Sequence, residues 1–419
     1  MDRARRPALP ALLAISLLVA VFAAVPARAA SPTARIAARL DHALTGAGSR
    51  SGVFVRDLRT GATLYSARAA TPRIPASVEK LLTTSTALRR FGPQGRLTTD
   101  VLTTNPVDAA RHTAGDLVLS GGGDPTLDRA GINALAHRVA RLVRRVDGAV
   151  VGDESRFDAR RGGPRTDWAY DRDVEGVLGA LTLGRGWSPT GSPALAAARA
   201  FAHALRARGV KIAGATRTGP GAPLQNLVAD IPSPTMAELA TRTNVPSDNF
   251  YAETLLKDLG ATFAGAGTTP AGAGVVTASA AQIGVRARVA DGSGLSRANR
   301  IAPREVVDLL GALHRDTVAG PAFEASLAVA GRSGTLTRRM RGTPAAGACR
   351  GKTGTIDGVS TLAGYCTPAG GIPVAFAVMM SGVRLDHARA AQDRLVTALA
   401  SIRATALRAA PAAPARRAP

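Results

Sequence analysis

Three short motifs, far apart in this 419-residue chain, constrain its fold more than any other feature of the sequence. An S-x-x-K motif comes first, an S-D-N motif follows, and a K-T-G motif closes the series, at residues 77–80, 247–249 and 352–354. An accidental S-x-x-K is common, but the ordered set is expected by chance in well under roughly 1% of such chains. If the set is functional, the fold must bring three distant stretches into one pocket.

Lysine is rare in the chain, and half of its lysines lie in these motifs. An arginine stays protonated, whereas a buried lysine can lose its proton and act as a base. Packing on one helix face would account for a serine and a lysine three residues apart, but not for a lysine where the chain otherwise prefers arginine. Of 53 cationic residues, only four are lysine: Lys80, Lys211, Lys257 and Lys352.

The motif side chains have the functional groups that acyl transfer through a serine requires. Ser77 is the predicted nucleophile, and Lys80, one helical turn away, is the predicted base that takes its proton. Lys80 must then be neutral part of the time, and burial and a nearby Lys352 would both lower its pKa. Ser247 is predicted to pass a proton between the lysines and the departing amine. The predicted catalytic set is Ser77, Lys80, Ser247 and Lys352.

The remaining motif residues are predicted to bind the substrate. Asn249 can hold a substrate amide, and the backbone N–H groups of Ser77 and Thr355 can stabilise a tetrahedral oxyanion. Lys352, Thr353 and Thr355 also present donors to a terminal carboxylate. The reaction predicted is acyl transfer at a peptide bond next to a free carboxylate. The predicted substrate-binding residues are Asn249, Thr353, Gly354 and Thr355.

The two ends of the chain are predicted to lie outside the fold. A basic start, an apolar run at about residues 8–25 and a small-x-small cleavage site predict a secretory signal peptide over residues 1–29. An uncleaved membrane anchor is the alternative, which Pro10 and Pro26 disfavour. The Ala/Pro/Arg tail, residues 408–419, is predicted to be disordered. The protein is therefore expected to be exported, either periplasmic or extracellular at the cell wall.

The chain is strongly basic, with a formal net charge of +23. Nucleic acid is not the expected partner, because the charge is scattered as arginine, aromatic residues make up only 4%, and an exported protein meets no genome. An anionic envelope, with its wall polymers and membrane lipid head groups, is a better partner for such a surface. Nucleotide composition that favours arginine codons is the alternative and accounts for much of the count.

The chain has two cysteines and six histidines. Cys349 and Cys366 flank a predicted hairpin that turns near Asp357 and Gly358, so they would face each other across two antiparallel strands. An exported chain permits a disulfide, and two free thiols are the alternative. The histidines show no paired-ligand spacing, so neither a metal nor a cofactor is expected.

The length and the pattern of elements predict two α+β domains, one inserted into the other. The catalytic domain is predicted at residues 30–96 and 226–407, with the S-x-x-K on a helix that ends near Phe91 and a strand at 372–381 that is buried on both faces. The inserted α+β domain is predicted at residues 97–225.

These motifs occur together with several others along nearly the whole mature chain. In this combination the sequence resembles the D-alanyl-D-alanine carboxypeptidase/endopeptidase family, the class C low-molecular-mass penicillin-binding proteins. The segments that carry the resemblance are Ile74-Pro75-Ala76-Ser77, Gly115-Asp116-Leu117, Gly123-Asp124-Pro125-Thr126-Leu127, Ser247-Asp248-Asn249, Asp291-Gly292-Ser293-Gly294-Leu295-Ser296, Lys352-Thr353-Gly354-Thr355 and Leu362-Ala363-Gly364-Tyr365.

The resemblance implies a fold and a substrate. The fold is a serine transpeptidase/β-lactamase-like domain, with an antiparallel sheet flanked by helices and a helical lobe, that carries an inserted α+β domain. The substrates would be peptidoglycan stem peptides that end in D-Ala-D-Ala, and β-lactams would be covalent inhibitors. In some relatives an acid of the inserted domain meets the diaminopimelate of the stem peptide, and Asp153 is the candidate for that role.

One departure from the family and two alternatives bear on the function. Members with a second, nested insert carry more sequence where this chain passes quickly from Leu183 to a helix at Ala196, so that extra domain is expected to be missing or reduced. This departure puts in doubt any endopeptidase role that depends on it. A serine β-lactamase is one alternative, although the E-x-x-L-N of class A enzymes does not follow the S-D-N. A catalytically silent wall-binding protein on the same scaffold is the other.

Overall fold

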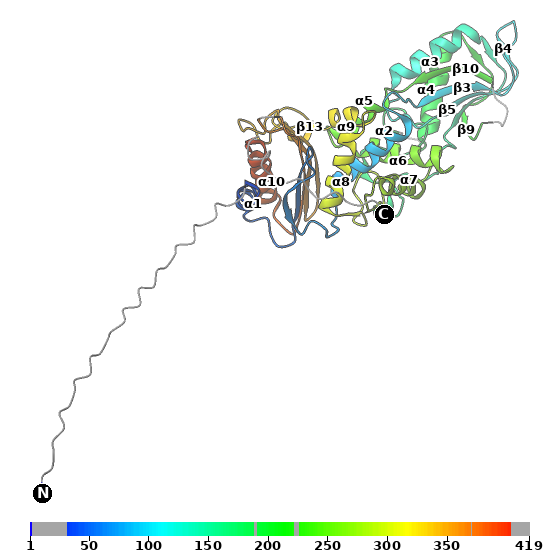
Figure 1. Ribbon diagram of the computed structural model, residues 1–419. Helices are drawn as coiled ribbons and strands as arrows, with labels where there is room; N and C mark the ends of the chain where they lie inside the picture. The colour runs from blue at the N-terminus through cyan, green and yellow to red at the C-terminus, as the bar shows by residue number, and fades with distance from the viewer. Residues whose placement is uncertain (2–31, 188–190, 222–225, 370, 404–419) are drawn as a thin grey trace. The chain divides into compact units, whose positions relative to one another are not determined.

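A six-stranded antiparallel sheet carries the K-T-G motif on one of its strands (Figure 1). The computed structural model describes residues 1, 32–187, 191–221, 226–369 and 371–403. The predicted signal peptide, apart from Met1, and the predicted disordered tail fall outside these residues. The strands, in their order across the sheet, are β13 (Ala328–Val329), β14 (Cys349–Ile356), β15 (Val359–Cys366), β16 (Val374–Ser381), β1 (Gly52–Asp57) and β2 (Thr63–Ala67).

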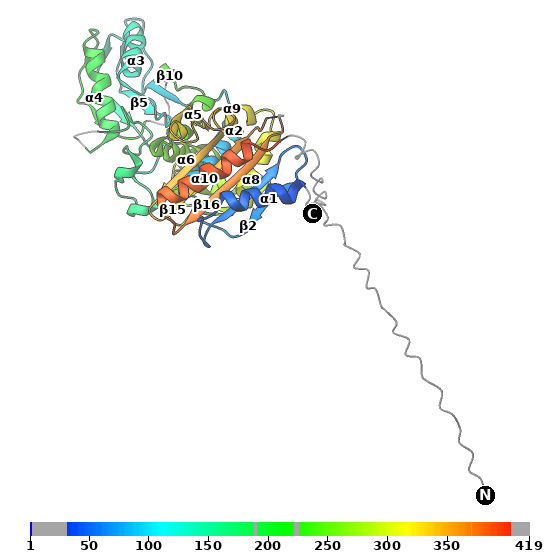
Figure 2. The ribbon, with the colours of Figure 1, turned by 90° about the vertical axis from the view of Figure 1, so that its left-hand side faces the viewer.

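Strand β16 is buried on both faces, as its continuous apolar run predicts. Its alternate residues belong to two separate cores: Phe376 packs in one, and Ala377 in the other. Helices α1 (Pro32–Ala43) and α10 (Leu385–Ala400) cover the first face, and α8 (Pro303–Arg315) packs on the second (Figure 2). Apolar side chains on both faces of one strand therefore fix the sheet between two helical layers.

A group of helices on the second face holds the other two motifs. The short helix η1 (Ala76–Glu79) leads into α2 (Lys80–Phe91), and the S-D-N enters α6 (Asn249–Phe263), with Asp248 as the N-cap and Asn249 as the first helical residue. Buried side chains from these helices and from the sheet form one apolar core. The other members of the group are α5 (Met236–Asn244), α7 (Thr269–Gln282), α9 (Gly320–Ala325) and the two-stranded sheet of β11 (Ala287–Arg288) and β12 (Arg300–Ile301). The short helix η4 (Gly334–Leu336) lies beside β13 and β14, and its Leu336 packs in the core of the first face.

A second sheet, of five strands, lies where the sequence predicts an inserted domain. Its order is β10-β3-β5-β7-β9, and α3 (Arg129–Leu142) and α4 (Pro193–Arg206) share a separate apolar core with it. Strand β10 begins just after residue 225, the predicted end of the inserted domain, and it pairs with β3. The second sheet therefore extends past the predicted boundary. The strands are β3 (Thr98–Thr103), β5 (Leu117–Gly121), β7 (Val150–Asp153), β9 (Arg217–Thr218) and β10 (Asn226–Pro232).

Smaller elements complete the part of the chain around this second sheet. A three-stranded parallel sheet consists of β4 (His112–Thr113), β6 (Arg145–Val146) and β8 (Lys211–Ile212). Two short helices, η2 (Pro164–Thr166) and η3 (Arg172–Val174), lie between β7 and α4. Helices and separate sheets together confirm the predicted α+β class. Within the described residues, no helix combines the length and apolar character needed to cross a bilayer.

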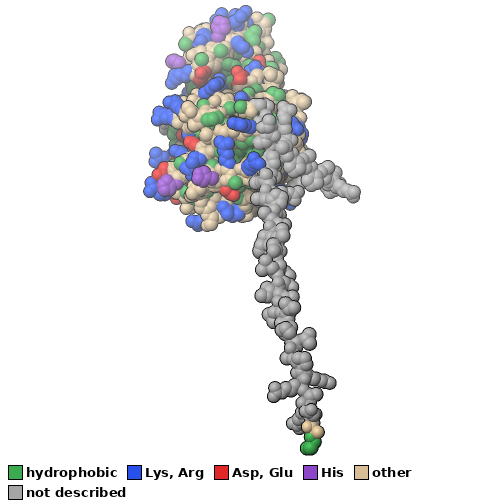
Figure 3. Space-filling view, turned by 60° about the vertical axis from the view of Figure 1, so that its left-hand side comes forward, with side chains coloured by type: hydrophobic (Ala, Val, Ile, Leu, Met, Phe, Trp, Pro, Cys, Tyr) green, Lys and Arg blue, Asp and Glu red, His purple; other side chains and the backbone are tan. Residues whose placement is uncertain are grey.

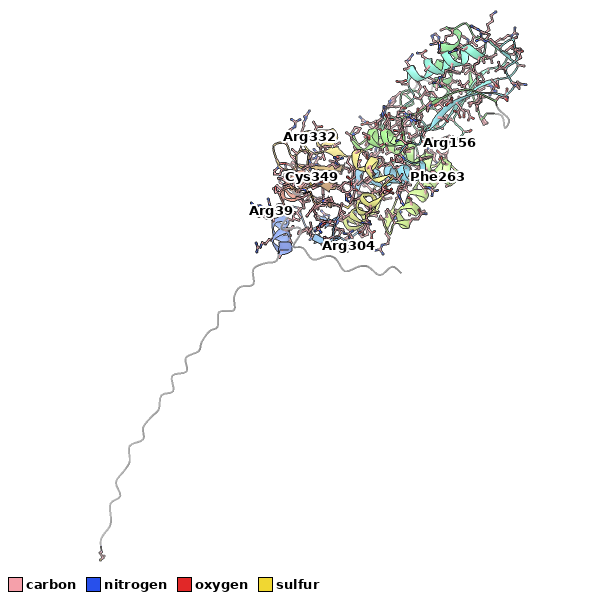
Figure 4. All side chains as sticks on the ribbon, turned by 45° about the horizontal axis from the view of Figure 1, so that its top comes forward. Arg39, Arg156, Phe263, Arg304, Arg332 and Cys349 are labelled. Carbon is pink, nitrogen blue, oxygen red and sulfur yellow. A yellow bond between two sulfur atoms is a disulfide. The ribbon has the colours of Figure 1, made fainter. Side chains whose placement is uncertain are left out.

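Cys349 and Cys366 form a disulfide between β14 and β15, and the alternative of two free thiols is wrong. The two residues are paired directly across the ladder, with their Cα atoms 4.1 Å apart. The hairpin between them turns at Asp357 and Gly358, where Gly358 has a φ of +69°. Figure 4 labels Cys349 at the start of the K-T-G strand.

Candidate active site

Ser77 lies in η1, the turn that enters α2, rather than within α2 itself. The preceding residue, Ala76, has a φ of +47°, a left-handed conformation that is costly for a residue with a side chain. The carbonyl oxygen of Pro75 accepts hydrogen bonds from the Val78 N–H at 3.3 Å and from the Thr361 hydroxyl of β15 at 2.7 Å. The sheet thus holds a strained turn that presents the serine.

Lys80 is fully buried, and its amine meets the serine. Lys80 Nζ lies 3.0 Å from Ser77 Oγ, 2.6 Å from Asn249 Oδ1 and 2.8 Å from the carbonyl oxygen of Ser293. The first two motifs therefore meet at one amine, and the glycine-rich turn at residues 291–294 supplies its third partner.

Burial lowers the pKa of Lys80 to about 8, because the charged amine loses its hydration. The carboxyl groups of Glu253 and Asp291 act in the opposite direction and favour the charged amine. Glu253 is itself buried, and burial raises its pKa to about 7. Lys80 is thus able to exchange its proton near neutral pH, as a base for Ser77 must.

The K-T-G strand lies against the serine turn. A Cβ on Gly354 would lie 2.9 Å from Ser77 N, so only a glycine lets the two backbones approach so closely. Lys352 is fully buried, and its Nζ donates to the Thr353 carbonyl oxygen at 2.8 Å. Burial, together with the charge of Lys80, holds the pKa of Lys352 well below its usual range. The Thr353 hydroxyl donates to Thr335 Oγ1 at 2.8 Å.

The S-D-N segment is fixed from two sides. Ser247 has a left-handed φ of +70°, and the Asp248 carboxylate caps α6 by accepting from Tyr251 N at 3.0 Å. Arg185 donates two hydrogen bonds to Asp248, at 2.7 and 3.0 Å. The Asn249 amide nitrogen donates to the Asp173 carbonyl oxygen at 2.7 Å. Residues from the segment between β7 and α4 therefore position the second motif.

A cleft of about 730 Å³, called the Ser77 cleft below, brings five of the predicted residues to one surface. Lys80 and Lys352 are fully buried and do not line it, although the Lys80 amine contacts Ser77, and Gly354 lies in the strand that lines it. Sequence reasoning missed seven further lining residues. The predicted residues that line it are Ser77, Ser247, Asn249, Thr353 and Thr355, and the missed ones are Leu295, Gly334, Thr335, Thr337, Arg338, Arg339 and Arg389.

Sequence reasoning also missed the buried acids behind Lys80. Glu253 accepts hydrogen bonds from the N–H groups of Gly292 and Ser293, at 3.1 and 2.8 Å, and so orients the Ser293 carbonyl towards the amine. Gly294 has a φ of +87°, and a Cβ there would collide with the Ala76 carbonyl oxygen. The sequence Asp-Gly-Ser-Gly at residues 291–294 could have indicated a tight turn that supports Lys80.

Asp153, the candidate contact for diaminopimelate, does not line the Ser77 cleft. Its two carboxylate oxygens accept hydrogen bonds from the backbone N–H groups of Ser155 and Gly221, at 2.8 and 2.9 Å. The residue ends β7 and is almost fully buried. Asp153 therefore stabilises loops beside the second sheet, and its contact with diaminopimelate stays a prediction.

The fold and this constellation define the class: a penicillin-binding protein of the serine transpeptidase type. The comparisons with known proteins agree. The chain belongs to the D-Ala-D-Ala carboxypeptidase 3 (S13) family of serine peptidases, whose model matches residues 34–177 and 174–402.

Two relatives and one solved structure illustrate the similarity. The D-alanyl-D-alanine carboxypeptidase of Actinomadura sp. (strain R39) is 32% identical, over 95% of this chain and 90% of its own length. Carboxypeptidase DacB of Mycolicibacterium smegmatis is 30% identical, over 83% of this chain and 79% of its own. Penicillin binding protein 4 of Haemophilus influenzae shares the fold, with a TM-score of 0.75 at 19% identity, over 86% of this chain and 99% of its own.

Proposed function

We propose that the protein is an exported D,D-carboxypeptidase that removes the terminal D-alanine of peptidoglycan stem peptides through an acyl-enzyme on Ser77. One observation carries the proposal: Ser77 Oγ lies 3.0 Å from the amine of Lys80, which is buried and has a pKa of about 8. A hydroxyl beside such an amine has a base that is partly neutral at physiological pH.

In the acylation step, neutral Lys80 takes the proton of the Ser77 hydroxyl while Oγ attacks the carbonyl carbon of the penultimate D-alanine. The tetrahedral oxyanion accepts hydrogen bonds from the backbone N–H groups of Ser77 and Thr355. When the peptide bond breaks, its nitrogen needs a proton. Ser247 passes it from Lys80, which becomes neutral again, and free D-alanine leaves; the nearby Lys352 amine favours this transfer by lowering the proton affinity of Lys80.

The substrate is held by the K-T-G strand. Thr353 and Thr355 line the cleft as donors for the terminal carboxylate, and the positive charge of Lys352 beneath them favours the anion when that amine is protonated. Asn249 can bind the peptide amide through its side chain. A water molecule, activated by the same Lys80 amine, then attacks the ester and restores Ser77.

Several finer points belong to the same proposal. Cleavage of cross-links would break an equivalent D-Ala bond, so D,D-endopeptidase activity is included. β-Lactams would acylate Ser77 and act as covalent inhibitors. Residues 97–225, extended by β10 because that strand pairs with β3, would form a domain inserted into a catalytic domain of residues 30–96 and the chain from the end of β10 to residue 407, and residues 1–29 would direct export.

Labelling with a fluorescent penicillin tests the proposal. The wild-type protein should be labelled covalently, Ser77→Ala should not, and an unlabelled wild type would contradict the acyl-enzyme. Digestion of purified muropeptides with mass spectrometry of the products then separates the two peptidase activities. Loss of a single D-alanine marks the carboxypeptidase, and conversion of dimers to monomers marks the endopeptidase.

A further inference from the structure

An arginine-rich groove adjoins the Ser77 cleft. It has a volume of about 620 Å³ and lies between α1, α10 and the segment at residues 338–343. Arg338 lines both the groove and the Ser77 cleft, and Arg389 lines the cleft beside it. We call this hollow the arginine groove, and its arginines are Arg39, Arg338, Arg341 and Arg394.

The charges of this groove are not compensated. Within the described residues, none of its four arginines forms a salt bridge with an acid. Arg341 and Arg394 donate only to backbone carbonyl oxygens, those of Thr337, Ala43 and Thr45. Asp393, an acid in the groove wall, is already paired with Arg339 at 2.7 Å. The groove therefore presents several cationic groups that an anion could satisfy.

Some arginines elsewhere in the protein are paired with acids. Arg161 pairs with Glu154, and Arg185 pairs with Asp248, each at 2.7 Å. In the described part of the chain, exposed arginines such as Arg206 and Arg288 have no salt bridge either, so the distinguishing feature of the groove is that four arginines gather around one depression. Figure 3 shows a face on which Lys and Arg side chains clearly outnumber Asp and Glu, and Figure 4 labels Arg39 on α1.

The position of the groove favours one kind of anion. Its arginines lie on three chain segments around a hollow lined also by Ala43, Met340 and Ala398. The groove is shallow and continues into the Ser77 cleft through Arg338, so a linear polymer that lies along the surface can contact both. Guanidinium groups bind phosphate and carboxylate oxygens in pairs.

We propose that the arginine groove binds a linear wall polyanion, a chain with repeated phosphate or carboxylate groups, which holds the enzyme beside its substrate. This role goes beyond the proposed peptidase reaction. Arg39, Arg341 and Arg394 do not line the Ser77 cleft, so the groove and the catalytic residues are separable by mutation.

Binding of two defined polymers to the full mature chain tests this inference. The probes are inorganic polyphosphate and poly-glutamate, measured by titration at several salt concentrations. Charge reversal of both outer arginines, R39E/R341E, should weaken binding of at least one polymer about tenfold or more and flatten its salt dependence. The neutral variant R39Q/R341Q should lose less affinity for the polymer than R39E/R341E.

The matched control is R206E/R288E, which changes the net charge equally at two exposed positions outside the groove and the cleft. Equal weakening in both double variants would overturn the proposal, because net charge alone would then explain the binding. Stronger binding to vesicles of phosphatidylglycerol than to either polymer, with the same loss in R39E/R341E, would also overturn it. Penicillin labelling of each variant reports separately on the proposed peptidase function.

Discussion

The backbone of Gly354 passes so close to the backbone of Ser77 that a methyl group on residue 354 would lie 2.9 Å from the Ser77 nitrogen. The same methyl would lie 2.8 Å from the Pro75 carbonyl oxygen and 2.2 Å from the Thr361 hydroxyl. Space, rather than a left-handed backbone, therefore explains the glycine of the K-T-G motif. The contact joins the strand that would hold the substrate to the turn that presents the nucleophile.

Replacement of Gly354 by alanine should displace β14 or η1 and misplace Ser77. A shift of about 1 Å costs on the order of 100-fold in rate, so acylation by penicillin should fall by about that factor. Gly358→Ala is the matched control in the same hairpin, because its Cβ would meet no atom within 4 Å. It should cost about 1–2 kcal/mol of stability for its left-handed φ and leave acylation nearly unchanged. Wild-type acylation by Gly354→Ala would show that the close contact is unimportant.

Glu253 is expected to set the pH at which Lys80 becomes active. Its charge raises the pKa of Lys80, and glutamine would keep an acceptor oxygen but remove that charge. In Glu253→Gln the pKa of Lys80 should fall below about 8, so the rise of the acylation rate should move to lower pH. Glu305→Gln, at an acid paired with Arg286, should leave the profile in place. A lower rate with an unmoved profile would mean that Glu253 only supports the turn.

Arg185 is expected to position the S-D-N segment through its paired hydrogen bonds to Asp248. Arg185→Ala should reduce the acylation rate about tenfold, because losing a partly buried partner of a charged group costs roughly 1–3 kcal/mol. Arg185→Lys should recover only part of the rate, since lysine cannot donate in the same fork. Arg145→Ala removes a more exposed pair with Asp147 and serves as the control. Equal acylation in the Arg185 and Arg145 variants would contradict the role.

The Cys349–Cys366 disulfide should stabilise the hairpin that carries the K-T-G motif. It closes a loop with a sequence separation of 17 residues, for which chain entropy predicts a contribution of about 3 kcal/mol. The double variant C349A/C366A should unfold in urea with a free energy lower by about that amount. Unfolding of the wild type in a reductant should approach that of the variant, and identical stability of the oxidised and variant proteins would refute the contribution.

The motif residues could be predicted from the sequence because each needs a particular chemical group. The Lys80 amine contacts the Ser77 hydroxyl and the Asn249 amide oxygen. The apolar run of β16 indicates a strand in the interior of the sheet. Local patterns also identified the hairpin turn at Gly358. These features depend on side-chain chemistry and on the period of hydrophobic residues, both of which are visible in a single chain.

The rest depends on contacts between segments that no local pattern records. No sequence pattern near Arg185 or Asp173 indicates that these residues bind the S-D-N segment. Arg338 and Arg389 line the cleft only because the tertiary fold brings their segments there. Asp153 shows the same limit. An acid at the end of a strand is as often a ligand of nearby backbone N–H groups as of a substrate, and only the fold distinguishes the two.

The rate of Ser77 acylation by a fluorescent penicillin, measured against pH, tests the central claim most directly. The neutral form of Lys80 is the base, so the wild-type rate should rise with pH and level off above about 8. Lys80→Arg, which stays protonated, should remain unlabelled across the range, as should Ser77→Ala. Labelling of Lys80→Arg at the wild-type rate, with the same pH profile, would contradict the account.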